Sequence, residues 1–225
     1  MRERPILMSA PMVRASMRDV DPKTQTRRVI PAPWLDANPE TETGRAVLIA
    51  SCRYGVVGDR LWVREAAWIA PPRFGDDVDA THRDMDGRLR FVGYDADMND
   101  DSRGTARDYG VRKTPSIHMP RWASRLTLEI ASVRVERVQS ISDADARAEG
   151  VALGQRPCSY VGRCNSGRCP AHNYVPAFAA LWDETNGARP GCSWADDPWV
   201  FAIEFRRLPP DVESAVRAQM GAEGR

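Results

Sequence analysis

The segment Arg125-Leu-Thr-Leu-Glu-Ile-Ala-Ser-Val-Arg-Val-Glu-Arg-Val138 carries the strongest secondary-structure signal in the chain. Apolar side chains recur along it at nearly alternate positions, namely Leu126, Leu128, Ile130, Val133, Val135 and Val138. Such alternation is typical of a β-strand with one buried face. The segment predicts two strands or one bent strand, and a domain in which strands dominate.

Further strands are expected on both sides of this segment, each short and bounded by turn residues. We place them at the start of residues 5–14, at Arg28–Ile30, at Leu61–Glu65 and at Trp199–Leu208, with a hairpin around Leu89–Tyr94. The polar segments Lys23–Arg28 and 31–45 are predicted to be loops. The predicted fold class is therefore α+β and mostly β.

Three short helices are expected to flank these strands, over Arg14–Val20, 142–150 and 173–186. Ser142 is a suitable N-cap, and Gly187 a suitable stop after the third helix. In the third helix an apolar stripe at helical spacing predicts a face packed on the core. The stripe consists of Val175, Phe178, Leu181 and Trp182.

The length of 225 residues, of which 42% are hydrophobic, fits one domain with its own core. We assign residues 1–208 to this domain, with an acidic insertion at about 71–111, a cysteine-rich insertion at about 154–172, and a flexible tail at 209–225. No run reaches the roughly 20 apolar residues of a membrane span. The N-terminus also lacks the apolar stretch of a secretory signal, which predicts a soluble, cytoplasmic protein.

Charge is distributed unevenly although the net charge is only +1. Residues 1–30 hold seven basic and three acidic side chains (net +4), and residues 103–125 hold six and one (net +5). Residues 76–101 hold nine Asp and three Arg (net −6). Two basic segments that converge would form a patch for phosphate or nucleic acid. Solvated surface charges balanced by the acidic stretch remain the alternative.

The segment Lys23-Thr-Gln-Thr-Arg-Arg28 contains one of only two lysines among 32 basic residues, the other being Lys113. Burial beside Arg27 or Arg28 would lower the pKa of Lys23 and leave a neutral amine. That amine could act as a general base for Thr26 as nucleophile, with a neighbouring cation stabilising the oxyanion. The alternative is a phosphate-binding loop without chemistry.

Two further groups of residues are candidates for binding. The segment 113–122 combines His118, Arg121 and Trp122, so that Trp122 or Trp62 could stack on a base while Arg121 and Arg125 contact phosphate. His118 could shuttle a proton, and a structural role for His118 and Trp122 is the alternative. Glu149 ends a helix, where an acid opposes the helix dipole, which indicates either a role elsewhere or an ordinary solvent-facing side chain.

The cysteine-rich segment has the spacing Cys158-x5-Cys164-x4-Cys169-x2-His172. Three thiolates and one imidazole suit a structural zinc ion in tetrahedral geometry. Cys192 is a possible substitute ligand, and Cys52 lies outside the site. Reduced cysteines in a loop are the alternative, and four protein ligands would leave no open position for catalysis.

Several of these stretches resemble the ASCH superfamily, whose fold is a PUA-like β-barrel. The similarity lies in Lys23-Thr-x-Thr-x-Arg28, in Gly58-Asp-Arg-Leu-Trp-Val-Arg-Glu65, in Ser116-Ile-His-Met-Pro-Arg-Trp122, in Leu181-Trp-Asp183, and in the strand Val200-Phe-Ala-Ile-Glu-Phe205. The greatest likeness is to ASCH proteins of phages and prophages, which implies a bacterial host cell. The resemblance covers most of residues 5–208 and implies a barrel with short flanking helices and insertions.

The resemblance also implies an activity, because small bacterial ASCH proteins include an N(4)-acetylcytidine amidohydrolase. Its catalytic lysine, threonine and glutamate fall on Lys23, Thr26 and Glu149, and its arginine falls on Arg28. We add Trp62, Arg64, His118, Arg121 and Trp122 as candidate substrate-binding residues. The expected partner is a nucleoside or single-stranded nucleic acid, and no organic cofactor is expected.

Two other functions stay open at this point. The first is a non-catalytic module that binds RNA or modified DNA through the same residues. The second is a ribonuclease; the chain offers no evident carboxylate cluster for paired metal ions, so such a nuclease would work without metal.

Overall fold

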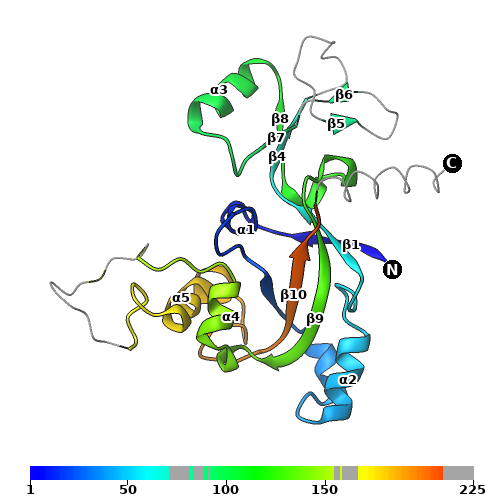
Figure 1. The fold of residues 1–225 in the computed structure, drawn as a ribbon, viewed down its shortest axis with the longest axis vertical. Coiled ribbons are helices and arrows are strands. Elements are labelled where there is room, and N and C mark those ends of the chain that lie inside the picture. Colours follow the sequence, from blue (N-terminus) through cyan, green and yellow to red (C-terminus); the bar gives the residue numbers. More distant parts are fainter. Residues whose placement is uncertain (71–81, 84–88, 91, 155–157, 159–166, 210–225) are drawn as a thin grey trace. The chain divides into compact units, whose positions relative to one another are not determined.

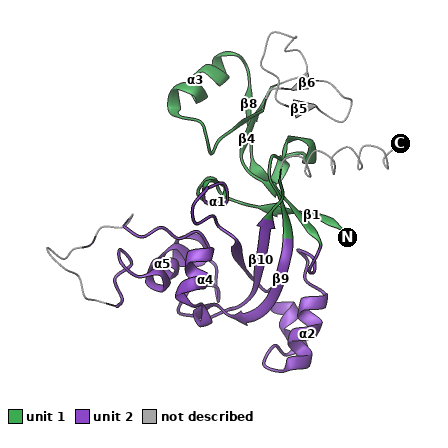
Figure 2. Ribbon diagram, in the orientation of Figure 1, with its two compact units in different colours: residues 1–14, 59–129, 207–225 green, residues 15–58, 130–206 purple. Residues whose placement is uncertain are grey.

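The computed structural model describes residues 1–70, 82–83, 89–90, 92–154, 158 and 167–209. It is a mixed α/β structure with a five-stranded sheet in the order β1-β3-β9-β10-β2 and a three-stranded sheet in the order β7-β4-β8 (Figure 1). The chain divides into two compact units, of residues 1–14, 59–129 and 207–225 (unit 1) and of residues 15–58 and 130–206 (unit 2) (Figure 2).

Unit 1 is built on short paired strands. β1 (Glu3–Leu7) lies parallel to β3 (Arg60–Arg64), and β3 pairs antiparallel with the start of β9 (Thr127–Arg137). In the three-stranded sheet, β4 (Ala67–Ile69) pairs antiparallel with both neighbours, β7 (Val92–Tyr94) and β8 (Arg112–Thr114).

The remaining described elements of unit 1 are smaller. β5 (His82–Arg83) pairs with β6 (Leu89–Arg90), so the hairpin expected around Leu89–Tyr94 is divided between β6 and β7. Helix α3 (Asp100–Asp108) begins at Asn99, whose side chain accepts from the Ser102 backbone N–H. The buried residues Val92, Tyr94, Ala106 and Val111 pack with β4 in small apolar clusters, so this part of the acidic segment contributes to a core.

Unit 2 contains the longer elements of the sheet. β2 (Gln25–Val29) pairs antiparallel with β10 (Trp199–Arg207), and Thr26 lies opposite Ile203. Helix α1 (Ala10–Ser16) ends where this unit begins, and α2 (Glu42–Ala50) starts at Thr41, whose hydroxyl accepts from the Gly44 N–H.

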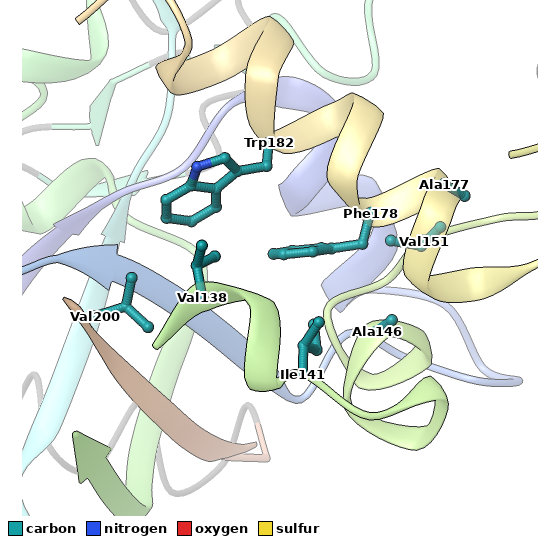
Figure 3. Close-up of a cluster of buried hydrophobic side chains, with 8 residues drawn as sticks. All are labelled: Val138, Ile141, Ala146, Val151, Ala177, Phe178, Trp182 and Val200. Atoms are coloured by element: carbon teal, nitrogen blue, oxygen red, sulfur yellow. The ribbon is translucent and has the colours of Figure 1, made fainter. Parts of the chain in front are cut away.

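Two helices of unit 2 cover one apolar cluster. Helix α4 (Asp143–Ala148) begins at Ser142, whose hydroxyl accepts from the Asp145 N–H, and helix α5 (Tyr174–Asn186) is followed by Gly187. Figure 3 shows Phe178 and Trp182 pointing from α5 into the cluster. Its buried members are Val138, Ile141, Ala146, Val151, Ala177, Phe178, Trp182 and Val200.

The structure confirms several elements and corrects others. Residues 127–137 form one strand, in which the buried positions change phase between Ile130 and Val133. The helices at 143–148 and 174–186 are confirmed, as is the last strand. The predicted stripe on α5 is wrong at Leu181, whose exposed fraction is 41%.

Three sequence predictions about the first fifty residues are wrong. The first helix covers Ala10–Ser16 rather than Arg14–Val20, because Pro11 is tolerated in a first helical turn. β2 begins at Gln25 inside the predicted loop, because β10 supplies its backbone partners. Within 31–45 the structure has a 3₁₀ helix over Ala32–Ala37 and the start of α2.

No helix in the described ranges is long and apolar enough to cross a membrane. Among the described strands, β1 and β2 are the edges of the five-stranded sheet, so closure into a barrel stays a prediction. Residues 210–225, the expected tail, lie outside the described residues.

Candidate functional site

A buried ion pair joins Lys23 to Glu149 within unit 2. The Nζ atom of Lys23 lies 2.7 Å from Oε2 of Glu149 and also donates to the Glu149 backbone carbonyl at 2.7 Å. The exposed fractions of the two side chains are 1% and 4%. The structure thus brings together two of the three residues expected to be catalytic, from positions 126 apart in the chain.

The backbone on both sides of this pair is held in place. The Lys23 N–H donates to Ala15 at 2.9 Å, and the Thr24 N–H donates to Ala148 at 2.8 Å. Gly150, directly after Glu149, has a φ of +84°, a conformation that glycine adopts without steric cost. A Cβ atom there would lie 2.8 Å from the Ala15 Cβ and 2.9 Å from the Lys23 Cβ. The absence of a side chain at Gly150 therefore lets Lys23 approach the end of α4.

Burial makes the charged form of Lys23 unfavourable. Desolvation lowers the pKa of Lys23 from its ordinary value of 10.5; Glu149 opposes this effect, and the cations of Arg28 and Arg27 add to it. The net direction is downward, which increases the fraction of neutral amine at a given pH. A lysine in this state is able to accept a proton.

The guanidinium of Arg27 is fully buried next to the pair. Its Nη1 lies 3.3 Å from Oε1 of Glu149, and its Nη2 forms ion pairs with Glu136 and with Asp145, the latter at 3.3 Å. Nη1 also donates to the side chain of Gln25. Glu149 is therefore contacted through one carboxylate oxygen by Lys23 and through the other by Arg27.

Asp145 belongs to the same network. Its carboxylate accepts from Gln25 Nε2 at 3.1 Å and from Arg134 at 3.3 Å. Partial burial by itself would raise the pKa of Asp145, but the Gln25 hydrogen bond and the charges of Arg27 and Arg134 outweigh it and lower that pKa. An ionised Asp145 in turn balances part of the buried charge of Arg27.

The side-chain hydroxyl of Thr26 is buried and unpaired among the described residues. Its residue surface is fully buried, and its Oγ1 has no hydrogen-bond partner in the part of the chain that the structure describes. Alternation along β2 directs Thr26 to the opposite side of the strand from Gln25 and Arg27. A buried hydroxyl without a partner is destabilising by about 1–3 kcal/mol, so its retention needs an explanation.

Arg28 lies two positions after Thr26 in β2, so the two side chains lie on the same face of the strand. Burial lowers the pKa of Arg28; Tyr54 and Glu149 act against this effect, and Arg53 and Arg189 reinforce it. Arg28 therefore lies within electrostatic reach of Glu149 and of two further arginines of unit 2.

The candidate substrate-binding residues of unit 1 are engaged with one another. The guanidinium carbon of Arg64 lies 4.8 Å from the centre of the Trp62 ring, and that of Arg121 lies 5.8 Å from it. Arg121 also forms two hydrogen bonds with Glu3, at 2.7 and 2.9 Å.

His118 and Trp122 lie close to Arg121 in the sequence but differ from each other in exposure. His118 is exposed in a 3₁₀ helix over Ser116–His118. Trp122 is half-buried and packs against the cluster that contains Tyr94 and Met119. Arg125 pairs with the buried Glu65, so it too has acidic partners in unit 1.

A second group in unit 2 has the composition of a metal site. The ligand atoms of Cys158, Cys169 and His172 lie within 4.8 Å of one another, and the two Sγ atoms are 3.7 Å apart. Three such donors could bind a metal ion. Cys164, the fourth expected ligand, lies outside the described residues. Cys192 is half-buried and is not a member of this group.

Sequence reasoning named Arg27 as a possible neighbour of Lys23, but it did not identify Gln25, Asp145 and Glu136 as part of the site. The available signal was the alternation of Gln25 and Arg27, two polar residues that lie two positions apart. The prediction of a loop over Lys23–Arg28 hid this alternation, because a shared face exists only in a strand.

Comparison with known proteins adds no relative to this description. No protein-family model, no curated protein and no solved structure matches the chain.

Proposed function

We propose that this chain is a hydrolase of the ASCH type that cleaves an acyl–nitrogen bond on a cytidine-type nucleoside. One observation supports the proposal above all. It is the buried Lys23–Glu149 pair, three positions along the chain from a buried Thr26 hydroxyl that has no hydrogen-bond partner among the described residues. A base, a group that orients it and an uncommitted hydroxyl are the parts that nucleophilic catalysis needs.

The proposed reaction has two halves. Neutral Lys23 takes the proton of Thr26 as Oγ1 attacks the acyl carbon, and Arg28 stabilises the oxyanion that forms. The carbon–nitrogen bond then breaks, and the Lys23 ammonium returns the proton to the departing nucleoside amine. Water hydrolyses the acyl-threonine ester with the same base, which releases the acid and restores Thr26. Throughout, Glu149 orients the amine of Lys23.

The fold proposed for this activity is a PUA-like barrel spanning residues 1–208. The five-stranded mixed sheet, with a parallel β1–β3 pair at one end, is compatible with such a barrel. Closure would need contacts that complete the edges of the sheet.

The test is to incubate the protein with N(4)-acetylcytidine, acylated nucleoside analogues and short RNAs, and to identify the products by mass spectrometry. Release of acid from a nucleoside is the expected result. Intact nucleosides together with retained RNA would instead indicate a binding module, and shortened RNA a ribonuclease. Either outcome would overturn the hydrolase proposal.

A matched pair of variants tests the role of Lys23. Lys23→Arg should abolish turnover and leave the circular dichroism spectrum unchanged, because arginine keeps the charge but cannot act as a base. Lys113→Arg, which changes the only other lysine, should retain turnover. Unchanged turnover in Lys23→Arg would exclude lysine as the base.

We also propose that the group of Cys158, Cys169 and His172 binds structural zinc. Two thiolates at about 2.3 Å from a tetrahedral zinc ion lie about 3.8 Å apart, close to the 3.7 Å between these Sγ atoms. Metal analysis of the purified protein should find about one zinc per chain. Cys169→Ser should lose the metal, whereas Cys192→Ser should keep it; equal zinc content in both variants would contradict the assignment.

A further inference from the structure

The two oxygens of the Glu149 carboxylate are contacted by different cations. Lys23 contacts Oε2 at 2.7 Å, and Arg27 contacts Oε1 at 3.3 Å. The guanidinium of Arg27 is a cation, so Glu149 faces a second positive charge beside that of Lys23. The carboxylate of Glu149 therefore interacts with two cations rather than with Lys23 alone.

Arg27 itself has little freedom to move. Its guanidinium contacts Gln25 on its own strand, Glu136 on β9 and Asp145 on α4. The ring of Phe178, from α5, lies with its centre 5.9 Å from the guanidinium carbon. These contacts come from four elements of unit 2 and hold the planar guanidinium in one orientation.

The charged groups around the Lys23–Glu149 pair and around Arg27 come from several segments of unit 2. They are Arg27 and Arg28 on β2, Asp145 on α4, Glu136 and Arg134 on β9, Glu204 on β10, and Arg18, which donates to the Gly150 carbonyl. Within this set, Arg27 contacts Oε1 of the Glu149 carboxylate, and Lys23 contacts Oε2.

Two consequences for Lys23 follow from the position of Arg27. Its positive charge repels the ammonium form of Lys23, which is one of the causes that lower the pKa of Lys23. Its contact with Oε1 also draws Glu149 charge away from the ammonium. Both effects favour the neutral amine, and both would be lost if the side chain at position 27 were uncharged.

We propose that Arg27 is a positioning residue that holds the Glu149 carboxylate from the side opposite Lys23 and keeps Lys23 available as an uncharged base. The proposal deepens the proposed function and rests on it in assigning the base to Lys23. Arg27 does not contact the reacting atoms in this scheme; it acts through Glu149.

The test uses the fact that the chain has only two lysines. Protein labelled with ¹³C at the lysine Cε gives two signals, and Lys113 is an internal reference. The titration midpoint of Lys23 should move to higher pH in Arg27→Gln, and the acid limb of the pH–rate profile should move with it. Arg134→Gln is the matched control, because Arg134 forms ion pairs with Asp145 and Glu136, whereas the Glu149 carboxylate forms its ion pairs within the described residues with Lys23 and Arg27. The Lys23 midpoint should stay unchanged in this variant.

A second measurement needs no variant and therefore does not depend on the folding of Arg27→Gln. In the wild-type protein, the ¹⁵Nη signals of Arg27 should change with the same midpoint as the Lys23 Cε signal, because loss of the ammonium frees Glu149 for Arg27. The proposal would be overturned if the Lys23 midpoint is unchanged or lower in folded Arg27→Gln. It would also be overturned if the Arg27 signals of the wild-type protein do not change over the pH range in which Lys23 titrates. Both readouts work without substrate, so their failure is distinguishable from failure of the hydrolase proposal.

Discussion

Replacement of Gly150 by alanine should disturb the candidate site through the backbone next to Glu149. The new alanine would have to adopt a φ of +84°, a conformation that is unfavourable for an L-residue by about 1–2 kcal/mol. Its Cβ would also lie 2.8 Å from the Ala15 Cβ and 2.9 Å from the Lys23 Cβ, and overpacking of this kind typically costs about 1–3 kcal/mol. The expected loss in the free energy of unfolding is therefore about 2–5 kcal/mol.

Gly191→Ala is the matched control for this prediction. Gly191 also belongs to unit 2 and has a positive φ, of +69°, but a Cβ there would meet nothing within 4 Å. It should lose only the conformational part, about 1–2 kcal/mol. Any stabilisation through a stiffer unfolded chain is common to both variants and cancels in the difference.

The assay is urea unfolding followed by circular dichroism, with the lysine Cε spectrum as a local readout. In Gly150→Ala the Lys23 signal should shift while the Lys113 signal stays in place. Equal losses of stability in the two glycine variants, with an unmoved Lys23 signal, would refute the claim that Gly150 makes room for Lys23.

Three further predictions concern the same unit. Thr26→Val should abolish turnover and raise the free energy of unfolding by about 1 kcal/mol, because it removes a buried hydroxyl that has no hydrogen-bond partner among the residues the structure describes. A loss of stability in thermal unfolding would show that the hydroxyl is bonded. The pKa of Lys23 is lower in the folded protein than its ordinary 10.5, so between these two pKa values the unfolded chain binds more protons than the folded chain. Across this pH window the free energy of unfolding of the wild-type protein should therefore rise with pH relative to that of Lys23→Met. Parallel stability–pH curves for the two proteins would contradict this. Chelation of metal should lower the melting temperature of the wild-type protein, whereas the melting temperature of Cys169→Ser should change little if at all. The same change in both proteins would show that Cys169 is not a ligand of a stabilising metal ion.

Elements with a strong local pattern could be predicted from the sequence. Alternating apolar residues identified the strand at 127–137, and Ser142 and Gly187 marked the ends of two helices. In each case the signal lies within one element, because side-chain periodicity and capping depend on residues a few positions apart.

β2 shows why the neighbouring prediction was wrong. Its residues Gln25, Thr26, Arg27 and Arg28 are polar, and polar runs are typical of loops. The strand forms because the apolar β10 supplies its hydrogen-bond ladder, and because Glu149, Asp145 and Glu136 neutralise the buried charges. None of these partners is close to β2 in the chain.

The sequence by itself determined the strand pattern of β9, the caps of α4 and α5, and a Lys–Thr segment with the chemistry for base catalysis. Only the tertiary structure decided that Lys23 pairs with Glu149 and that Arg27 contacts the other carboxylate oxygen. It also decided that the Thr26 hydroxyl is buried with no hydrogen-bond partner in the described part of the chain. The physical reason is that local periodicity reports which face of an element is buried, whereas an ion pair between residues 126 positions apart depends on strand register and on a helix end that a glycine lets approach.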